Sequence, residues 1–253
     1  NSIVLNGEGI ILQDSENSII ANNQINSSRY VTLLYSSENT RIINNTAYTT
    51  FYGINLGTNN VSVINNKIYD STHGVGLGGG SAHYIAYNTI SYLRSGSGSY
   101  GVDYDNSNNN TIIYNNFTNT GIGIRLRTWS TIPTIIRGNR FEDMSDAAIS
   151  FRTPANQTVY DSIIINSSID IRLESNYVST QTFVNLTFNK SNTQIDNGTI
   201  NVKYYTDIQV NSSAGQPINN QLVQAYDKDS NFENQNTTNT NGQTRFIITE
   251  YTQ

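Results

Sequence analysis

The chain of 253 residues is long enough for one large domain, or for one domain and a small module. Charged residues make up only 13% of it, whereas Asn, Ser and Thr contribute 39, 27 and 28 residues, a composition that excludes a mostly helical protein. The net charge of −5 removes the electrostatic drive for binding nucleic acid or an anionic membrane, so neither is expected as a partner.

The chain contains no cysteine, which excludes disulfides and thiolate metal sites. No apolar run approaches the roughly 20 residues that span a bilayer, and no signal-peptide pattern is present. The sequence starts at Asn1, and its first five residues already have the pattern of a strand. We therefore expect a processed or excised piece of a longer protein, with any export signal or anchor outside it.

Two short patterns recur along the first 190 residues, about every 23 residues. The first is an alternating apolar segment, which starts at Ile10, Val31, Ile54, Val75, Val102, Ile124, Ile149 and Ile171. The second is an aliphatic residue three places before an asparagine, in the pairs Ile20/Asn23, Ile42/Asn45, Val63/Asn66, Ile85/Asn88, Ile112/Asn115, Ile136/Asn139 and Ile163/Asn166.

These patterns predict an all-β fold, because alternation with a period of two indicates strands that bury one face. Several short strands in each repeat and no helix between them favour a parallel β-helix. Eight coils at the usual strand spacing give a rod of roughly 35 Å, which is expected to be right-handed. The asparagines would lie at the corners, where they tolerate left-handed backbone and can form side-chain ladders along the axis.

Two coils show the repeat most clearly, namely Gly53-Ile54-Asn55-Leu56 with Val63-Ile64-Asn65-Asn66-Lys67-Ile68, and Gly101-Val102-Asp103-Tyr104 with Ile112-Ile113-Tyr114-Asn115-Asn116-Phe117. This pattern resembles the NosD-like, pectate-lyase-type right-handed parallel β-helix repeat. The resemblance covers about residues 3 to 190 and implies the fold. It says little about activity, because lyases, hydrolases, epimerases, phage tailspikes and adhesins share that fold.

A second module is expected to follow the β-helix of residues 1–194. Residues 195–253 contain strand-like runs separated by turns at 211–215 and 227–231, and they resemble bacterial Ig-like, carboxypeptidase-regulatory-like modules. A stretch this short is too small for a complete seven-stranded sandwich. The module would therefore continue further or pack on the end of the rod as a cap.

Charged residues concentrate in the alternating segments of coils five to eight. If the first and third residues of each segment point inward, the outward positions hold Asp103, Asp105, Arg125, Arg127, Arg152, Arg172 and Glu174. In coil two the same rule places Thr32 and Leu34 outward. Asp103 is expected beside Arg125, and Asp105 beside Arg127, one strand spacing away.

Two interpretations of this concentration stay open. In the first, these charged residues bind an acidic polysaccharide. If the protein is a lyase, Arg125, Arg127, Asp103 and Asp105 are its catalytic candidates, and Ca²⁺ is a possible cofactor. Arg152 would contribute to binding, Trp129 would stack on a sugar, and the loops 94–99 and 128–134 would wall a groove. Alternatively, the charges form a salt-bridge ladder of little energetic weight.

Other candidate sites are weaker. His73 and His83 flank a glycine-rich coil, but with no third ligand indicated a turn role is favoured over a metal site. Twelve Asn-x-Ser/Thr motifs permit N-glycosylation of an exported protein. They are at Asn26, Asn44, Asn60, Asn109, Asn116, Asn156, Asn166, Asn185, Asn189, Asn197, Asn211 and Asn236.

The whole pattern resembles adhesin-like surface proteins of archaea and bacteria. It favours an extracellular structural or adhesive protein, a sheath or S-layer component at the cell surface, whose rigid rod contacts glycans, cell walls or other copies of itself. The alternatives are a polysaccharide lyase or glycoside hydrolase that acts on acidic glycans, and a phage tailspike, which would be a trimer.

Overall fold

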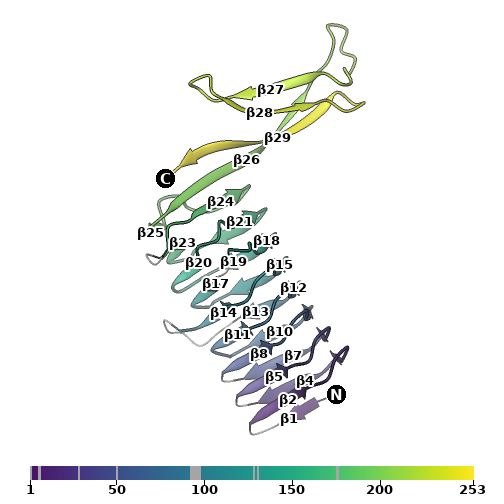
Figure 1. Ribbon diagram of the computed structural model, residues 1–253, viewed down its shortest axis with the longest axis vertical. Helices are drawn as coiled ribbons and strands as arrows, with labels where there is room; N and C mark the ends of the chain where they lie inside the picture. The colour runs from purple at the N-terminus through teal and green to yellow at the C-terminus, as the bar shows by residue number, and fades with distance from the viewer. Residues whose placement is uncertain are drawn as a thin grey trace.

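The computed structural model describes residues 2–4, 7–27, 29–49, 51–91, 98–127, 129, 131–174 and 177–253, and every regular element in them is a β-strand. The strands form a rod of stacked coils with the N-terminus at one end, and a two-stranded ribbon rises from the other end (Figure 1). A typical coil contributes three strands, one to each of three sheets that run the length of the rod.

Sheet I holds the longest strand of most coils. It consists of β2 (Glu8–Gln13), β5 (Tyr30–Tyr35), β8 (Tyr52–Gly57), β11 (His73–Leu77), β14 (Tyr100–Asp105), β17 (Ile122–Arg127), β20 (Ala147–Arg152), β23 (Ile169–Leu173) and β25 (Thr193–Ile195).

Sheets II and III complete each coil. Sheet II consists of β3 (Ile19–Ala21), β6 (Arg41–Ile43), β9 (Ser62–Ile64), β12 (Tyr84–Ala86), β15 (Thr111–Ile113), β18 (Ile135–Arg137), β21 (Thr158–Tyr160), β24 (Thr180–Val184), β26 (Thr199–Gln209) and β29 (Gln243–Thr252). Sheet III consists of β1 (Ser2–Val4), β4 (Gln24–Ser27), β7 (Thr46–Thr49), β10 (Lys67–Tyr69), β13 (Thr89–Ser91), β16 (Asn116–Thr118), β19 (Arg140–Glu142) and β22 (Ile163–Ile165).

Aliphatic side chains from successive coils stack inside the rod, which confirms the predicted parallel β-helix. In sheet II, Ile42, Val63, Ile85, Ile112 and Ile136 are direct neighbours in register and are completely buried. Each buried aliphatic side chain contributes about 1.5–3 kcal/mol of transfer free energy. The repeated Ile and Val positions therefore form one continuous core.

The asparagines of the repeat form the predicted ladder beside this core. Oδ1 of Asn66 accepts hydrogen bonds from the backbone N of Asn45 at 2.9 Å and from its Nδ2 at 3.0 Å. The same pair of bonds links Asn66 to Asn88, Asn88 to Asn115 and Asn115 to Asn139. These five asparagines are at most 4% exposed, so the ladder satisfies polar groups inside the rod.

The residue before each ladder asparagine makes the turn from sheet II to sheet III with left-handed backbone. Asn22, Asn44 and Asn65 have φ values of 57°, 55° and 55°. This confirms the predicted corner role of asparagine, which adopts this conformation at less cost than most residues. The turn and the ladder are thus made by neighbouring residues: the first forms the turn and points outward, and the second joins the ladder and points inward.

The predicted seventh pair, Ile163/Asn166, is wrong. Ile163 lies in sheet III beside Arg140, so the positions equivalent to Ile136 and Asn139 are Val159 and Ser162. Ser162 takes over the ladder position, since its Oγ accepts from the backbone N of Asn139 at 3.1 Å. Asn166 lies at an exposed turn after β22, with a φ of 54°.

The orientation expected for coil two is also wrong. Thr32, not Val31, is the register partner of Ile10 and Ile54, and Leu34 is the partner of Leu56. Thr32 and Leu34 are therefore inward, with exposed fractions of 1% and 0%. Val31 occupies the place that Gly53 holds in the next coil. The first apolar residue of this segment, Val31, is therefore one position before the residue that is equivalent to Ile10 and Ile54.

Parallel stacking continues past the end of the predicted β-helix segment. Thr193 and Ile195 of β25 lie beside Ile171 and Leu173, and the first residues of β26 lie beside β24 as far as Lys203. From Asn201 onward β26 also pairs with the antiparallel strand β29, and β27 (Leu222–Tyr226) forms a hairpin with β28 (Phe232–Thr237). The Ig-like nature of this segment and its boundary at residue 195 stay predictions.

The C-terminal end of the core is covered by residues of the last turn and of β29. Phe188, Ile195 and Tyr251 pack against the end of the hydrophobic core. Lys190 forms an ion pair with Glu250, and its ammonium lies 5.2 Å from the centroid of the Tyr251 ring. Part of the C-terminal segment therefore caps the rod, which protects strand edges that would otherwise be open.

Candidate functional site on the outer face of sheet I

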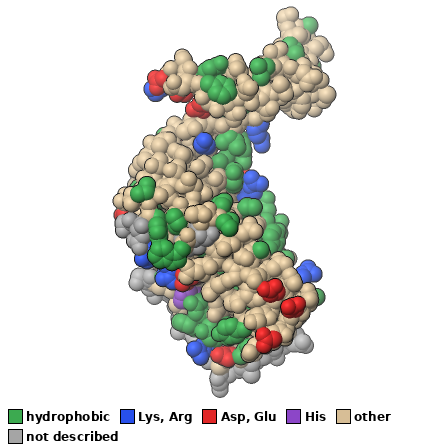
Figure 2. Space-filling model, viewed as in Figure 1, with side chains coloured by type: hydrophobic (Ala, Val, Ile, Leu, Met, Phe, Trp, Pro, Cys, Tyr) green, Lys and Arg blue, Asp and Glu red, His purple; other side chains and the backbone are tan. Residues whose placement is uncertain are grey.

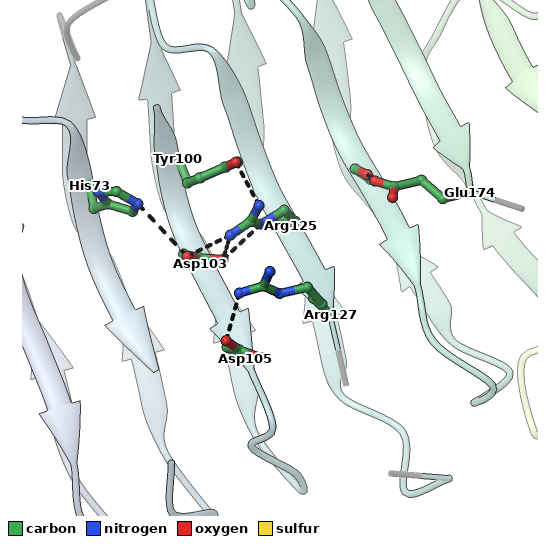
Figure 3. Close-up of polar contacts among 8 residues, drawn as sticks. His73, Tyr100, Asp103, Asp105, Arg125, Arg127 and Glu174 are labelled. Carbon is green, nitrogen blue, oxygen red and sulfur yellow. Dashed lines mark hydrogen bonds and ion pairs between the residues drawn. The ribbon is translucent and has the colours of Figure 1, made fainter. Parts of the chain in front are cut away.

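The outer face of sheet I brings the predicted charged residues together. Asp103 pairs in register with Arg125, and Asp105 with Arg127, as their spacing predicts. We call the set of charged residues on this face the charged strip; it comprises Asp103, Asp105, Arg125, Arg127, Arg152, Arg172 and Glu174. Figure 3 shows how the acidic and basic side chains of β14 and β17 face one another.

Asp103 and Arg125 form the most enclosed pair of the strip. Nε of Arg125 donates to Oδ1 of Asp103 and its second guanidinium nitrogen donates to Oδ2, both at 2.8 Å. The guanidinium carbon lies 3.6 Å from the centroid of the Tyr100 ring, and a third donor bonds the Tyr100 hydroxyl at 2.5 Å. With side-chain exposures of 8% and 16%, the pair is weakly screened by water.

Asp105 and Arg127 form a second pair nearer to the solvent. A guanidinium nitrogen of Arg127 donates to Asp105 at 2.6 Å, and the side chains are 40% and 39% exposed. Exposed ion pairs of this kind contribute at most about 1 kcal/mol to stability. Their groups therefore remain accessible to a ligand at little cost.

Arg127 and Arg152 bring two positive charges onto neighbouring strands. They are register partners in β17 and β20, whereas their acidic partners, Asp105 and Glu174, lie on the far sides. The contact from Arg152 to Glu174 is long, at 3.9 Å, and Glu174 also accepts from Ser150 at 2.7 Å. The buried Nε of Arg127 has no hydrogen-bond partner among the described residues.

Arg172 belongs to the strip by position but is bound elsewhere. Its guanidinium donates to both oxygens of Asp146, at 2.5 and 3.2 Å, and to Gln194 at 3.2 Å. The hydrogen bonds to Asp146 raise the pKa of Arg172. This residue therefore fastens the turn before β20 to the end of the rod.

A column of aromatic rings, which sequence reasoning missed, borders the strip. Tyr30, Tyr52, His73 and Tyr100 start successive strands of sheet I and are neighbours in register. The rings of Tyr30 and Tyr52 stack with centroids 5.6 Å apart, and those of Tyr52 and His73 stack at 4.2 Å. The signal was present in the sequence, because three of these residues directly precede a repeat glycine.

The imidazole of His73 connects the aromatic column to Asp103. Its Nε2 lies 3.8 Å from the Asp103 carboxylate, and burial lowers its pKa to about 4 although the nearby carboxylate opposes this shift. His73 is therefore neutral at neutral pH, and Asp103 relies on Arg125 for its compensating charge. Figure 3 shows His73 and Arg125 on opposite sides of Asp103.

Trp129 is an exposed aromatic residue in the segment that follows β17. Its side chain is 74% exposed, and its ring meets Tyr177 edge to face, with centroids 5.5 Å apart. Trp129 follows the end of β17, where Arg127 is located. Of the loops expected to wall a groove, residues 94–97, 128 and 130 lie outside the described residues.

The arrangement favours binding over proton transfer. Both oxygens of Asp103 are engaged by Arg125, and a guanidinium keeps its proton throughout the physiological range. The strip can instead offer planar cationic donors to an anionic group. The catalytic assignment of Arg125, Arg127, Asp103 and Asp105 stays a prediction.

The two histidines face different surroundings. Both are buried; His73 lies on the outer face of sheet I, whereas Nδ1 of His83 accepts a hydrogen bond from the backbone N of Val61 at 3.3 Å. No group of three or more potential metal ligands of the His, Cys, Asp or Glu types occurs in the described part of the chain. Within the same residues, no helix is long and apolar enough to cross a membrane.

The fold defines a parallel β-helix protein, and most of the surface in Figure 2 is neither hydrophobic nor charged. A sequence-family profile described as periplasmic copper-binding protein (NosD) matches residues 1–141, more than half of the chain. The chain therefore belongs to the NosD family and is an extracytoplasmic β-helix protein. Comparisons with curated proteins and with solved structures give no significant match.

The residues of this chain do not fit a copper site. Copper prefers thiolate, thioether and imidazole ligands, and the chain has no cysteine, one methionine and two histidines. The sulfur of Met144 is buried and accepts a hydrogen bond from Thr120 at 3.0 Å, and the two imidazoles do not converge. Both carboxylate oxygens of Asp103 are likewise engaged by Arg125 and are not open to Ca²⁺. Ca²⁺ as a cofactor stays a prediction.

Proposed function

We propose that the protein is a structural and adhesive element of the cell surface, whose rigid rod presents the outer face of sheet I to acidic glycans. The observation that carries this proposal is the pair of arginines on neighbouring strands, Arg127 and Arg152, with the exposed indole of Trp129 two residues after Arg127 in the chain. A carboxylate or sulfate between the two guanidinium groups would offset their mutual repulsion and accept from both.

The remaining residues of the site would support this contact. Asp103 fixes the guanidinium of Arg125 through two hydrogen bonds, and Asp105 orients Arg127 through one. Because Asp105 and Arg127 are more than one-third exposed, a ligand can compete for Arg127 with little loss. Trp129 offers a flat apolar surface to a sugar ring.

Modification of the twelve Asn-x-Ser/Thr motifs would leave this face open. None of these asparagines belongs to a strand of sheet I; most lie at the corners of the coils or in sheet III. We propose them as N-glycosylation sites of the exported protein. Peptide mass spectrometry of protein from its natural source, before and after glycan release, tests each site.

A binding assay on immobilised polymers tests the adhesive function. The panel consists of polygalacturonate, alginate, a sulfated glycan and neutral dextran. The double variant Arg127→Gln/Arg152→Gln should bind the acidic polymers roughly tenfold more weakly than the unchanged protein. Arg41→Gln is the matched control, because Arg41 is an exposed arginine on sheet II.

Two outcomes contradict this proposal. Equal binding by the double variant and the control would exclude the arginine pair, and equal binding to dextran would exclude charge recognition. Unsaturated oligosaccharides released from the polymers, and lost in Arg125→Ala, would instead identify a lyase. A stable trimer in light scattering would favour the tailspike alternative.

A further inference from the structure

Two tyrosines occupy a corner position that the chain otherwise fills with small or polar residues. Tyr87 and Tyr114 directly precede the ladder residues Asn88 and Asn115, and both have left-handed backbone, with φ values of 58° and 54°. The equivalent residues in other coils are Asn22, Asn44, Asn65, Gly138 and Asp161.

Left-handed backbone at a tyrosine costs more than at glycine, which has no Cβ to crowd the following carbonyl, and more than at asparagine, whose short side chain can form a compensating local hydrogen bond. Costs of this kind persist where the surrounding structure over-determines the residue, and they point toward a role. The neighbouring coil makes room for the ring. At Gly138, an added Cβ would lie 2.4 Å from two carbon atoms of the Tyr114 ring.

The two rings are held together and remain open to solvent. They stack with centroids 5.3 Å apart and an interplanar angle of 14°, on coils that are joined in register through β12 and β15. Tyr87 is 52% exposed and Tyr114 is 47% exposed. Two phenols are thus aligned across neighbouring coils, where both are open to a one-electron oxidant from the solvent.

We propose that Tyr87 and Tyr114 are a built site for oxidative tyrosine cross-linking, which joins two coils of this cysteine-free rod covalently. A one-electron oxidant, such as a haem peroxidase with hydrogen peroxide, removes one electron and one proton from each phenol. The two phenoxyl radicals then form a carbon–carbon bond between their ortho positions. Each ortho hydrogen returns to its phenolic oxygen as a proton, so the chain loses two hydrogen atoms and the peroxide is reduced to two water molecules.

A second stacked pair provides an internal comparison. Tyr48 and Tyr69 are register partners in sheet III, with ring centroids 5.5 Å apart and an interplanar angle of 28°. Tyr48 is 38% exposed, less than either corner tyrosine. The corner pair should therefore cross-link first, and the sheet III pair more slowly. This inference is independent of the proposed glycan contact.

The experiment treats dilute protein with peroxidase and hydrogen peroxide, and reads dityrosine fluorescence and peptide masses. The expected result is a linked peptide that contains Tyr87 and Tyr114 and lacks two hydrogens, formed within single chains. Tyr87→Phe retains the stacked ring but removes the phenol, so it should abolish this peptide. Tyr69→Phe is the matched control and should leave the peptide intact.

The cross-link should also raise the ratio of folded to unfolded oxidised protein in urea by at least roughly tenfold, since it closes a loop between coils and restricts the unfolded chain. Tyr87→Phe should show no such change after oxidation. The proposal is overturned if the native protein gives no linked peptide under conditions that dimerise N-acetyltyrosine amide. It is also overturned if urea-unfolded protein gives the same peptide in equal yield.

Discussion

The asparagine ladder and the charged strip are both columns of polar side chains repeated at one strand spacing, yet their surroundings differ. Ladder residues such as Asn88 are about 1% exposed and exchange hydrogen bonds with both neighbouring coils. The Asp105–Arg127 pair of the strip is about 40% exposed. The contribution of such a column to stability therefore depends on how far water reaches its side chains, and not on the stacking geometry alone.

The same contrast separates structure from function in this fold. Inside the rod, a missing partner leaves a buried polar group without a hydrogen bond, so the ladder tolerates few residue types. At the exposed pair Asp105–Arg127 on the outer face, water replaces a missing partner, so these charges are free to vary and to meet a ligand. The predictions that follow test this difference, from the largest expected effect to the smallest.

Removal of one ladder amide should have the largest effect. Asn88→Ala leaves the backbone N–H of Asn66 without its acceptor and removes the hydrogen bonds that the Asn88 amide donates to Val63 and Asn115 inside the rod. We expect the free energy of unfolding to fall by about 4 kcal/mol. Urea unfolding followed by circular dichroism measures it. Asn55→Ala, on the outer face of sheet I, should change stability by less than about 0.5 kcal/mol.

Acidification should weaken the rod through His83. Burial lowers the pKa of this imidazole to about 4, from 6.5 in the unfolded chain, so the unfolded state binds the proton more readily. The associated stability is complete above pH 6.5 and is lost as the pH falls toward 4, with a magnitude on the order of 3 kcal/mol. Urea unfolding at a series of pH values measures this loss.

A glutamine substitution isolates the titration of His83. Gln157 and Gln181 hold the same position in later coils, and their Oε1 atoms accept from backbone N–H groups at 2.6 and 2.8 Å. His83→Gln should therefore keep the hydrogen bond and remove about half of the stability loss between pH 6.5 and 4, because burial also lowers the pKa of His73 to about 4 and that imidazole supplies the other half. An unchanged acid slope in this variant would assign the effect to other groups.

The two ion pairs of the strip should respond differently to loss of their carboxylate. Asp103→Asn leaves the enclosed Arg125 without its charge partner and should cost about 2 kcal/mol. Asp105→Asn should cost at most about 0.5 kcal/mol, because water solvates Arg127. High salt should erase the second effect and leave most of the first. Equal costs for the two variants would contradict the difference in burial.

Much of the fold was predictable because the repeat records which residues face inward. Aliphatic residues three places before an asparagine mark the centre of a sheet II strand and the ladder position that follows it. The pairings of Asp103 with Arg125 and of Asp105 with Arg127 followed from the same spacing, since neighbours in a parallel sheet are one repeat apart.

The errors arose where a residue type changed without a change in its role. Ser162 accepts a backbone hydrogen bond as an asparagine does, so a search for asparagine passed over it and selected Asn166. Val31 stands where other coils have glycine, which shifted the expected faces of coil two. The aromatic column was missed because it precedes the repeat motif and has no fixed residue type.

The strand β26 has a mechanical consequence for the region that extends beyond the rod. Its first residues lie between β24 and β29, and its later residues form the ribbon that rises from the rod in Figure 1. One continuous strand thus joins the two parts, with no linker between them. A force on the β27–β28 hairpin is therefore transmitted through the β26–β29 ribbon to sheet II. A partner bound to the hairpin would rotate the whole rod instead of moving independently of it.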